Sequence, residues 1–182
     1  MELTVPMAYL RAIRLLTGKL DIRNYLNGVC ITDGAIIGTN GHYLGVIETE
    51  HVAGAAEIII PNEPLDAFFK LAGRLPFDAL ITYDADTRKG TLAAGSAVVQ
   101  FTGEYGRYPA YKRAMLHHDR ADGWLQFQWQ YLALFEKVAV ALGTKPSKQH
   151  KVTVLPSREM MSARVLIPEY PEFNGVCQPL RV

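Results

Sequence analysis

Hydrophobic and polar positions along the chain follow one plan three times. A short alternating stretch, typical of a β-strand, is followed by an amphipathic stretch with helical spacing. The alternating stretches are residues 2–6, 57–61 and 124–129, and the helical stretches are 7–16, 65–75 and 131–142. Proline closes the first two strands, where its missing N–H costs nothing at a helix start. Gly18, Gly73 and Gly143 fall near the expected helix ends, where a left-handed cap is common.

Further strand-like runs follow each helix, at residues 25–32, 36–47, 79–84, 90–101, 151–155 and 161–167. The chain therefore divides into three units of strand, helix and strands, which is the pattern of an internal repeat. Two such units would close into one domain, and the third would be half of another. The fold class expected is α+β, with repeated β-α-β-β-β units and the helices on one face of antiparallel sheets.

Each expected helix has an apolar side and a basic side. The basic residues on these sides, together with those that follow the third helix, are Arg11, Arg14, Lys70, Arg74, Lys137, Lys145, Lys148 and Lys151. Three repeated basic faces are consistent with a surface of helices that contacts nucleic-acid phosphates. Lysine and arginine are also ordinary solvated helix residues, so the pattern leaves both interpretations open.

Composition narrows the class of protein. The chain has 182 residues, of which 49% are hydrophobic and 20% charged, with a formal net charge of +1. This balance is that of a globular protein, and it excludes polyanion binding by bulk charge while leaving local patches open. Two cysteines do not make a disulfide framework and favour a reducing compartment. The N-terminal residues show no signal peptide and the chain no bilayer-spanning run, so we expect a cytoplasmic protein without membrane contact.

Candidate catalytic chemistry is weak. Asp84-Ala-Asp86 with Gly90 resembles a calcium loop only faintly and is better interpreted as a hairpin turn. The adjacent His117 and His118 have no further ligand at metal-site spacing. There is no nucleophile elbow, phosphate-binding glycine loop or Cys-x-x-Cys. We therefore expect neither an enzyme nor a metal or cofactor site.

Four segments of the chain resemble one known family, the bacterial DNA polymerase sliding clamp, which is the beta subunit of the replicase. Residues 23–29, Arg-Asn-Tyr-Leu-Asn-Gly-Val, resemble its R-x-Y-L-N-G strand, and residues 38–44, Gly-Thr-Asn-Gly-His-Tyr-Leu, resemble its A-T-D-G-H-R-L motif. Residues 108–114, Tyr-Pro-Ala-Tyr-Lys-Arg-Ala, are similar to its F-P-x-Y-x-R-V segment, and residues 176–182 resemble its V-x-M-P-x-R tail. Asn40, Tyr43 and Gln178 depart from these motifs, where the family has Asp, Arg and Met.

The resemblance divides the chain in two. Residues 1–118 resemble a complete clamp domain, the middle one, and residues 119–182 resemble the second half of the last domain. It implies a ring around duplex DNA that tethers a polymerase without making or breaking a bond, with the helices lining the hole. The residues then expected to face DNA are Arg11, Arg14, Lys19, Lys70, Arg74, Lys137, Lys145 and Lys148.

The resemblance also implies a pocket between the middle and last domains that binds short linear motifs of DNA polymerases and clamp-loader-type proteins. Positions that match the pocket are Leu26, Thr39, Gly41, His42, Tyr43, Leu44, Pro109, Arg113, Ala114, Val176 and Gln178. Clamps of this family close with twelve repeat units. This chain has three units, so the resemblance implies a homo-oligomer in which half-domains of different chains pair, and four chains, a tetramer, would supply the twelve units.

The sequence leaves two other functions open. The chain could be a truncated clamp mimic that captures clamp-binding peptides and interferes with host replication without encircling DNA. It could also be a small enzyme with an unrecognised site, although the sequence offers no convergent set of catalytic residues.

Overall fold

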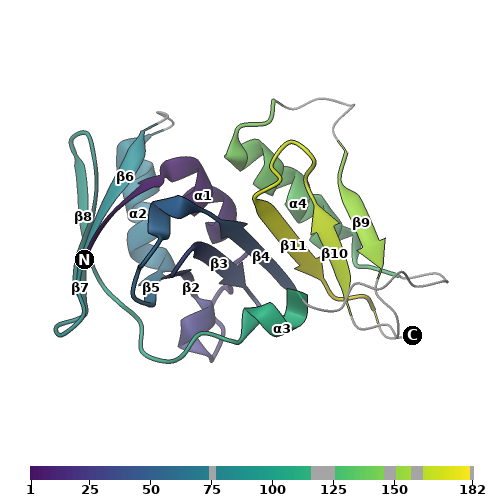
Figure 1. Ribbon diagram of the computed structural model, residues 1–182, viewed down its shortest axis with the longest axis horizontal. Helices are drawn as coiled ribbons and strands as arrows, with labels where there is room; N and C mark the ends of the chain where they lie inside the picture. Colours follow the sequence, from purple (N-terminus) through teal and green to yellow (C-terminus); the bar gives the residue numbers. More distant parts are fainter. Residues whose placement is uncertain (74–76, 116–125, 146–150, 157–161, 181–182) are drawn as a thin grey trace.

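Two antiparallel sheets form the framework of the protein (Figure 1). The computed structural model describes residues 1–73, 77–115, 126–145, 151–156 and 162–180. The smaller sheet has four strands in the order β1-β6-β7-β8. These strands are β1 (Glu2–Pro6), β6 (Asp78–Asp84), β7 (Lys89–Ala94) and β8 (Ala97–Thr102).

The larger sheet has seven strands in the order β5-β2-β3-β4-β11-β10-β9, and each neighbouring pair is antiparallel. Its strands are β2 (Gly28–Thr32), β3 (Ala35–Thr39), β4 (Tyr43–Glu48), β5 (Ile58–Pro61), β9 (Thr153–Pro156), β10 (Ala163–Leu166) and β11 (Phe173–Cys177). The contact between β4 and β11 joins the first repeat unit to the third, so the sheet continues across the boundary expected near residue 118.

The three main helices are α1 (Met7–Arg14), α2 (Asn62–Ala72) and α4 (Trp129–Leu142). Helix α1 lies between the other two and packs against both (Figure 1). All three bury their apolar sides in one continuous core with the sheets, as the apolar spacing predicted. The short elements are the helix α3 (Tyr111–Met115) and the 3₁₀ turns η1 (Asn24–Leu26) and η2 (Glu50–Val52).

The first two units exchange their leading strands. Strand β1 of the first unit pairs with β6 of the second, while β5 of the second pairs with β2 of the first. The backbone N–H that begins each helix also bonds to the other unit, from Met7 to Phe77 O at 3.3 Å and from Asn62 to Asn27 O at 2.9 Å. The two units are therefore related by an internal pseudo-two-fold axis.

A row of three glycines crosses the larger sheet where the helices come closest to it. Gly38, Gly45 and Gly175 are direct neighbours on β3, β4 and β11. A Cβ atom at Gly38 would lie 2.6 Å from the carbonyl oxygen of Ile13, and one at Gly175 would lie 2.6 Å from the Phe135 ring. The row thus lets α1 and α4 rest on the sheet on either side of the β4–β11 junction.

The structure corrects several sequence-based expectations. The strand expected at 124–129 is wrong over its described part, because 126–128 lie outside both sheets and Trp129 begins α4. Helix α1 ends at Arg14, two residues earlier than expected. Strand β11 was not predicted as a strand. Gly73 and Gly143 have positive φ at helix ends as expected, whereas Gly18 lies in a turn and its N–H bonds to Leu26 O.

The turn predicted at residues 84–90 is confirmed, whereas the strand-like run expected at 36–47 is two strands. Asn40 and Gly41 connect β3 to β4, and Gly41 has a φ of 91°. Asp84 closes the β6–β7 turn by accepting bonds from Asp86 N–H and the Thr87 hydroxyl.

Candidate functional site

The site expected from the clamp-like motifs is built around the β4–β11 junction. Thr39, Leu44 and Val176 are consecutive neighbours across β3, β4 and β11, although the last is more than 130 residues away along the chain. Leu44 and Val176 belong to a second apolar cluster, which lies on the face of the larger sheet opposite to the helices. The fold therefore brings together three of the predicted pocket residues on one face.

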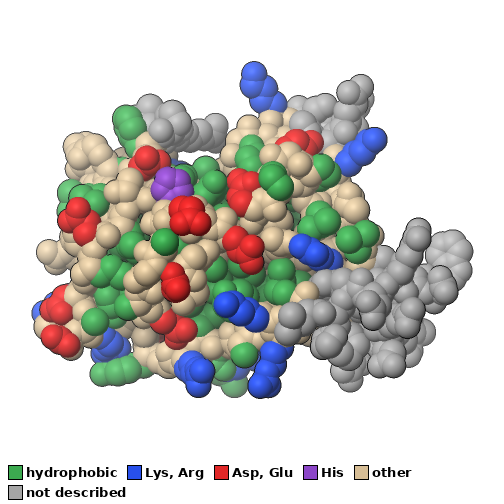
Figure 2. Space-filling model, in the orientation of Figure 1, with side chains coloured by type: hydrophobic (Ala, Val, Ile, Leu, Met, Phe, Trp, Pro, Cys, Tyr) green, Lys and Arg blue, Asp and Glu red, His purple; other side chains and the backbone are tan. Residues whose placement is uncertain are grey.

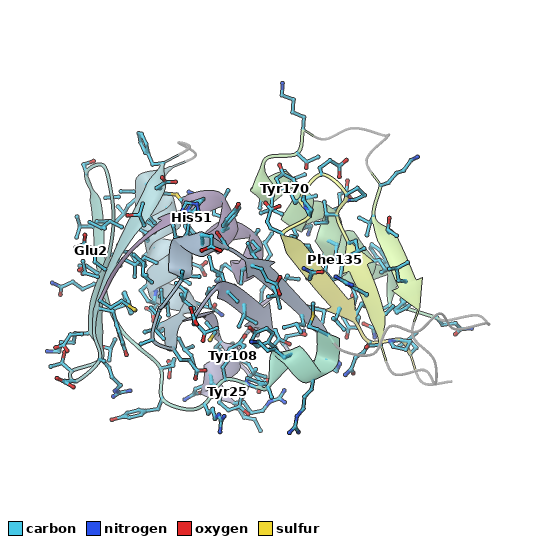
Figure 3. The ribbon with its side chains drawn as sticks, viewed as in Figure 1. Glu2, Tyr25, His51, Tyr108, Phe135 and Tyr170 are labelled. Atoms are coloured by element: carbon cyan, nitrogen blue, oxygen red, sulfur yellow. The ribbon has the colours of Figure 1, made fainter. Side chains whose placement is uncertain are left out.

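The chain that follows β8 covers this cluster. Tyr108 is buried in it, and Tyr25, Tyr111 and Met115 pack against its edge. Figure 3 places Tyr25 and Tyr108 side by side at the end of this face. Burial raises the pKa of the Tyr108 phenol, so the side chain stays neutral. These aromatic side chains were not among the predicted pocket residues, although residues 108 and 111 stand in the motif that suggested the pocket.

The β3–β4 turn is held by its own side chains. The Asn40 side-chain oxygen accepts bonds from the N–H groups of His42 and Tyr43 at 2.9 and 3.1 Å. The Thr39 hydroxyl donates to Tyr43 O at 2.7 Å and accepts from Gly41 N–H at 3.1 Å. An amide oxygen accepts these bonds as a carboxylate oxygen would, so this turn is compatible with Asn40 at the position where the resembled motif has Asp.

The neighbouring loop brings a guanidinium to this turn. The Arg23 guanidinium lies over Gly41, where a side chain on residue 41 would come within 3.2 Å of it. Arg23 also makes two bonds of 2.9 Å with the Asp21 carboxylate, from Nε and Nη2. These bonds lower the pKa of Asp21 to about 2. Arg23 was quoted in the sequence motif but not predicted as a site residue.

Tyr43 and Leu44 point to opposite faces of β4, as consecutive strand residues must. The Tyr43 ring packs edge-on against Tyr131 of α4 at 5.3 Å, and His42 stacks on the same ring at 5.8 Å. Gln178 is exposed, and its N–H donates to His42 O at 2.9 Å. Tyr43 therefore lies on the helix side of the sheet, away from the Leu44–Val176 face.

The other predicted pocket residues border the site to different degrees. Leu26 is buried in η1. Pro109, Arg113 and Ala114 are exposed on the segment that carries Tyr108 and α3. An extended ligand along α3 would thus meet exposed side chains from this segment, while the Leu44–Val176 pair lies beneath them.

Both arginines of α1 that were expected to face DNA contact α2 instead of projecting freely. The Arg11 guanidinium lies 4.7 Å from the centre of the Phe69 ring and donates to the carbonyl oxygens of Phe69 and Gly73, at the end of α2. Arg14 pairs with Asp66 at 2.5 Å, with 15% of the arginine side chain and 56% of the aspartate side chain exposed. A cation beside the last carbonyls of a helix stabilises it, so these contacts also join the two helices.

The remaining described cations of the expected lining are exposed, namely Lys19, Lys70, Lys137 and Lys145. Acidic residues are exposed on the same helices, at Glu63 and Asp66 of α2 and Glu136 of α4. Arg74 and Lys148 lie outside the described residues. The helix side thus carries solvent-accessible lysines among carboxylates rather than a continuous basic stripe.

The opposite side of the molecule has acidic side chains spread over it (Figure 2). Asp33, Glu48 and Glu50 are exposed there and line one hollow together with Tyr111 and Lys112 of α3. Lysine and arginine side chains also lie on this side, and Lys112 lines the same hollow, so both sides of the molecule carry charges of both signs.

Other chemistry finds little support in the described residues. No group of three or more His, Cys, Asp or Glu side chains is arranged there to hold a metal ion. Cys30 and Cys177 are both free and buried. The described helices include none with the length and hydrophobicity to span a membrane. His117 and His118 lie outside the described residues.

Antiparallel sheets on one side, a row of helices on the other and strand exchange between repeat units together define the fold of the DNA sliding clamps. The crystal structure of the DNA polymerase sliding clamp from Pseudomonas aeruginosa matches with a TM-score of 0.73 and 15% identity, over 100% of this chain and 67% of that one. A putative DNA polymerase III beta subunit from Eubacterium rectale matches with a TM-score of 0.75 and 10% identity, over 100% and 66%.

A third similar structure is the sliding clamp from Bartonella birtlesii bound to griselimycin, with a TM-score of 0.72 and 16% identity over 100% of this chain and 66% of that one. This chain therefore spans about two thirds of the length of these clamps. No protein-family model and no curated protein matches the sequence. The fold expected from the motifs is confirmed.

Proposed function

We propose that this protein acts as a sliding clamp, a processivity factor that encircles duplex DNA as a homo-oligomeric ring and tethers a polymerase or other partners. Such a function is topological and needs no catalytic residue. The observation that carries the proposal is the row of helices α2, α1 and α4 on one side of a sheet that continues through the β4–β11 junction. Repetition of this row around an axis would line a hole with helices.

DNA contact in the proposed ring falls mainly to the exposed lysines. Lys70 and Lys137 stand on different helices of the row, whereas Arg14 is already neutralised by Asp66. A lining of a few separated cations would bind phosphates weakly, which suits sliding. Among the described residues, we therefore assign the contact with DNA mainly to Lys19, Lys70, Lys137 and Lys145.

The test is a charge reversal on this side. Lys70→Glu with Lys137→Glu should weaken association with duplex DNA and flatten its dependence on salt by about one unit of log–log slope for each lost phosphate contact. Lys112→Glu is the matched control, because Lys112 is an exposed lysine of α3 on the opposite side. DNA association that is equal in the double variant and the control would refute the assigned lining.

Partners of the proposed clamp would bind beside the β4–β11 junction through short linear motifs. Pro109, Arg113 and Ala114 are the exposed residues of this region, whereas Leu44, Val176 and Tyr108 are buried in the apolar cluster that the segment after β8 covers. Arg113 gives this region a charged hydrogen-bond donor for an extended peptide. Binding of a clamp-binding peptide should therefore fall in Arg113→Glu and remain in Arg107→Glu, an exposed arginine on the same connecting segment.

One observation favours the second candidate, a clamp mimic that captures peptides without enclosing DNA. Both α1 arginines are engaged by α2, and carboxylates stand among the lysines, so the helix side is less basic than its sequence suggested. The mimic predicts peptide binding without measurable DNA association. The clamp predicts both, together with self-association.

A further inference from the structure

The contacts between the first two repeat units follow a rule that can be applied to the third. Each unit begins with a leading strand, β1 or β5, which pairs with the strand that follows the helix of the other unit, β6 or β2. The last residue of the leading strand lies opposite the first residue of that strand, Pro6 opposite Asp78 and Pro61 opposite Gly28. The first N–H of each helix bonds to the carbonyl just before that same strand, at Phe77 and Asn27. The leading strand and the first residue of the helix of each unit therefore both bond to the same strand region of the other unit.

The helices obey the same symmetry. The fifth residue of α1, Arg11, contacts the eighth residue of α2, Phe69. The eighth residue of α1, Arg14, contacts the fifth residue of α2, Asp66. Positions five and eight of each helix thus form the helix–helix contact of a paired domain.

The third unit also has a leading segment, a helix and a following strand, but among the described residues no other unit pairs with them as the first two units pair with each other. Strand β9 is the last strand of the larger sheet, so its outer edge is unpaired by any described strand. Residues 126–128 lead directly into α4 and lie outside both sheets. Trp129, the first residue of α4, is 74% exposed, whereas Met7 at the same position of α1 is 2% exposed.

A groove of about 300 Å³ lies along this side of α4. Ala133 and Glu136, the fifth and eighth residues of the helix, line it. Val152, which directly precedes β9, and Ile167 form part of its wall. The groove therefore includes the two helix positions, the fifth and the eighth, that α1 and α2 use against each other.

We propose that a second copy of this chain fills the groove, so that two third units pair around a two-fold axis as the first two units pair within one chain. The register follows from the internal pairs: Gln128 opposite Thr153, Phe127 opposite Val154 and Gln126 opposite Leu155 of the partner subunit. The Trp129 N–H donates to the carbonyl of Val152 in the partner subunit. Trp129 and the β9 edge become buried in the dimer.

Several features of the third unit fit a second copy. Both halves of the interface, the leading segment with α4 and the β9 edge, are present in each chain, so a two-fold interface is self-complementary. Only Glu136 and Lys137 of the fourteen α4 residues are charged, and a helix that is apolar on nearly all sides is normally covered. Glu136 would face the small, neutral Ala133 of the partner subunit, so like charges do not meet.

Cysteine pairing tests the register. Protein carrying Gln126→Cys is mixed with protein carrying Leu155→Cys and oxidised, since directly opposite residues of antiparallel strands have a Cα separation compatible with a disulfide. We expect a disulfide-linked dimer in the mixture and none in either protein alone. Thr153→Cys in place of Leu155→Cys is the shifted control and should cross-link much less. Absence of a cross-link in the mixture would overturn the proposed register.

A charge placed in the groove tests the interface by sedimentation, without DNA or peptide. Ala133→Glu faces Glu136 of the partner subunit and should raise the dimer dissociation constant at least tenfold. Adding Glu136→Lys to this variant should restore association, and Ala67→Glu, on an exposed position of α2, should leave it unchanged. Thermal unfolding of each variant shows that the chains remain folded.

The inference rests on the self-association of the proposed clamp, and its failure is distinguishable from failure of that function. A wild-type oligomer that is insensitive to Ala133→Glu overturns the α4 interface and leaves the ring standing. A wild-type monomer at micromolar concentration overturns both.

Discussion

Replacing Gly38 by alanine tests how closely α1 approaches the larger sheet. The added Cβ would lie 2.6 Å from the Ile13 carbonyl oxygen, about 0.8 Å short of ordinary contact at 3.4 Å. The obstacle is helix backbone, which cannot rotate away as a side-chain end can. Helix α1 would have to shift over the sheet, and with it the core that α1 shares with α2 and α4.

The cost of Gly38→Ala follows from the overpacking of a close-packed core. Such changes cost about 1–3 kcal/mol, and a backbone obstacle places this one at about 3 kcal/mol. For a chain of this size, the midpoint of thermal unfolding should fall by roughly 6–12 °C, at about 2–4 °C per kcal/mol. Urea unfolding followed by circular dichroism measures the free energy directly.

Gly45→Ala provides the matched comparison. Its Cβ would lie 2.1 Å from Leu16 Cδ1, the end of a flexible side chain. Leu16→Ala should therefore relieve Gly45→Ala in a double-mutant cycle, with a coupling energy of about 1 kcal/mol or more. The same Leu16→Ala should not relieve Gly38→Ala. A Gly38→Ala protein within about 0.5 kcal/mol of wild type, the range of ordinary surface changes, would refute the close approach of α1.

Three further outcomes follow from individual contacts. Asp66→Asn should release Arg14 from its ion pair, lower stability by about 1 kcal/mol or less, and strengthen association with duplex DNA; unchanged DNA association would count against a DNA-facing α1. Burial raises the pKa of Cys177 to about 11 and that of Cys30 further, so at pH 8 a thiol reagent should label neither before unfolding, and rapid labelling of the native protein would contradict their burial. Leu44→Ala should destabilise the protein by about 2–5 kcal/mol, as deletion of a buried leucine does, measured by urea unfolding; a smaller loss would place Leu44 outside the second cluster.

The elements that were predictable from the sequence are those with local signals. Apolar residues at helical spacing located α1, α2 and α4 to within a few residues, and Asp84-Ala-Asp86 with Gly90 located the β6–β7 turn. Strand β11 could not be found in this way. It contains Asn174 and Gly175, and all five of its residues are buried, so no alternation of polar and apolar positions marks it.

Part of the candidate site could not be predicted because it depends on contacts between residues that are far apart in the sequence. The motif resemblance selected Leu44 and Val176, and the sheet confirms that they are neighbours. It grouped Tyr43 with them, although consecutive strand residues point to opposite faces, so the alternation along β4 could have separated Tyr43 from Leu44. The basic helix faces were visible as a pattern, yet the engagement of Arg11 and Arg14 depends on where α2 docks, which helical spacing alone does not specify.

The mass of the protein in solution tests the central claim most directly. A clamp assembled from this chain must be an oligomer, and pairing of third units followed by closure of the ring gives a tetramer of four times the 20.2 kDa chain mass. Light scattering on a sizing column at micromolar concentration should therefore report a discrete multiple of the chain mass, with the tetramer as the closed form. A single species of 20.2 kDa would contradict the ring and favour the peptide-capturing mimic.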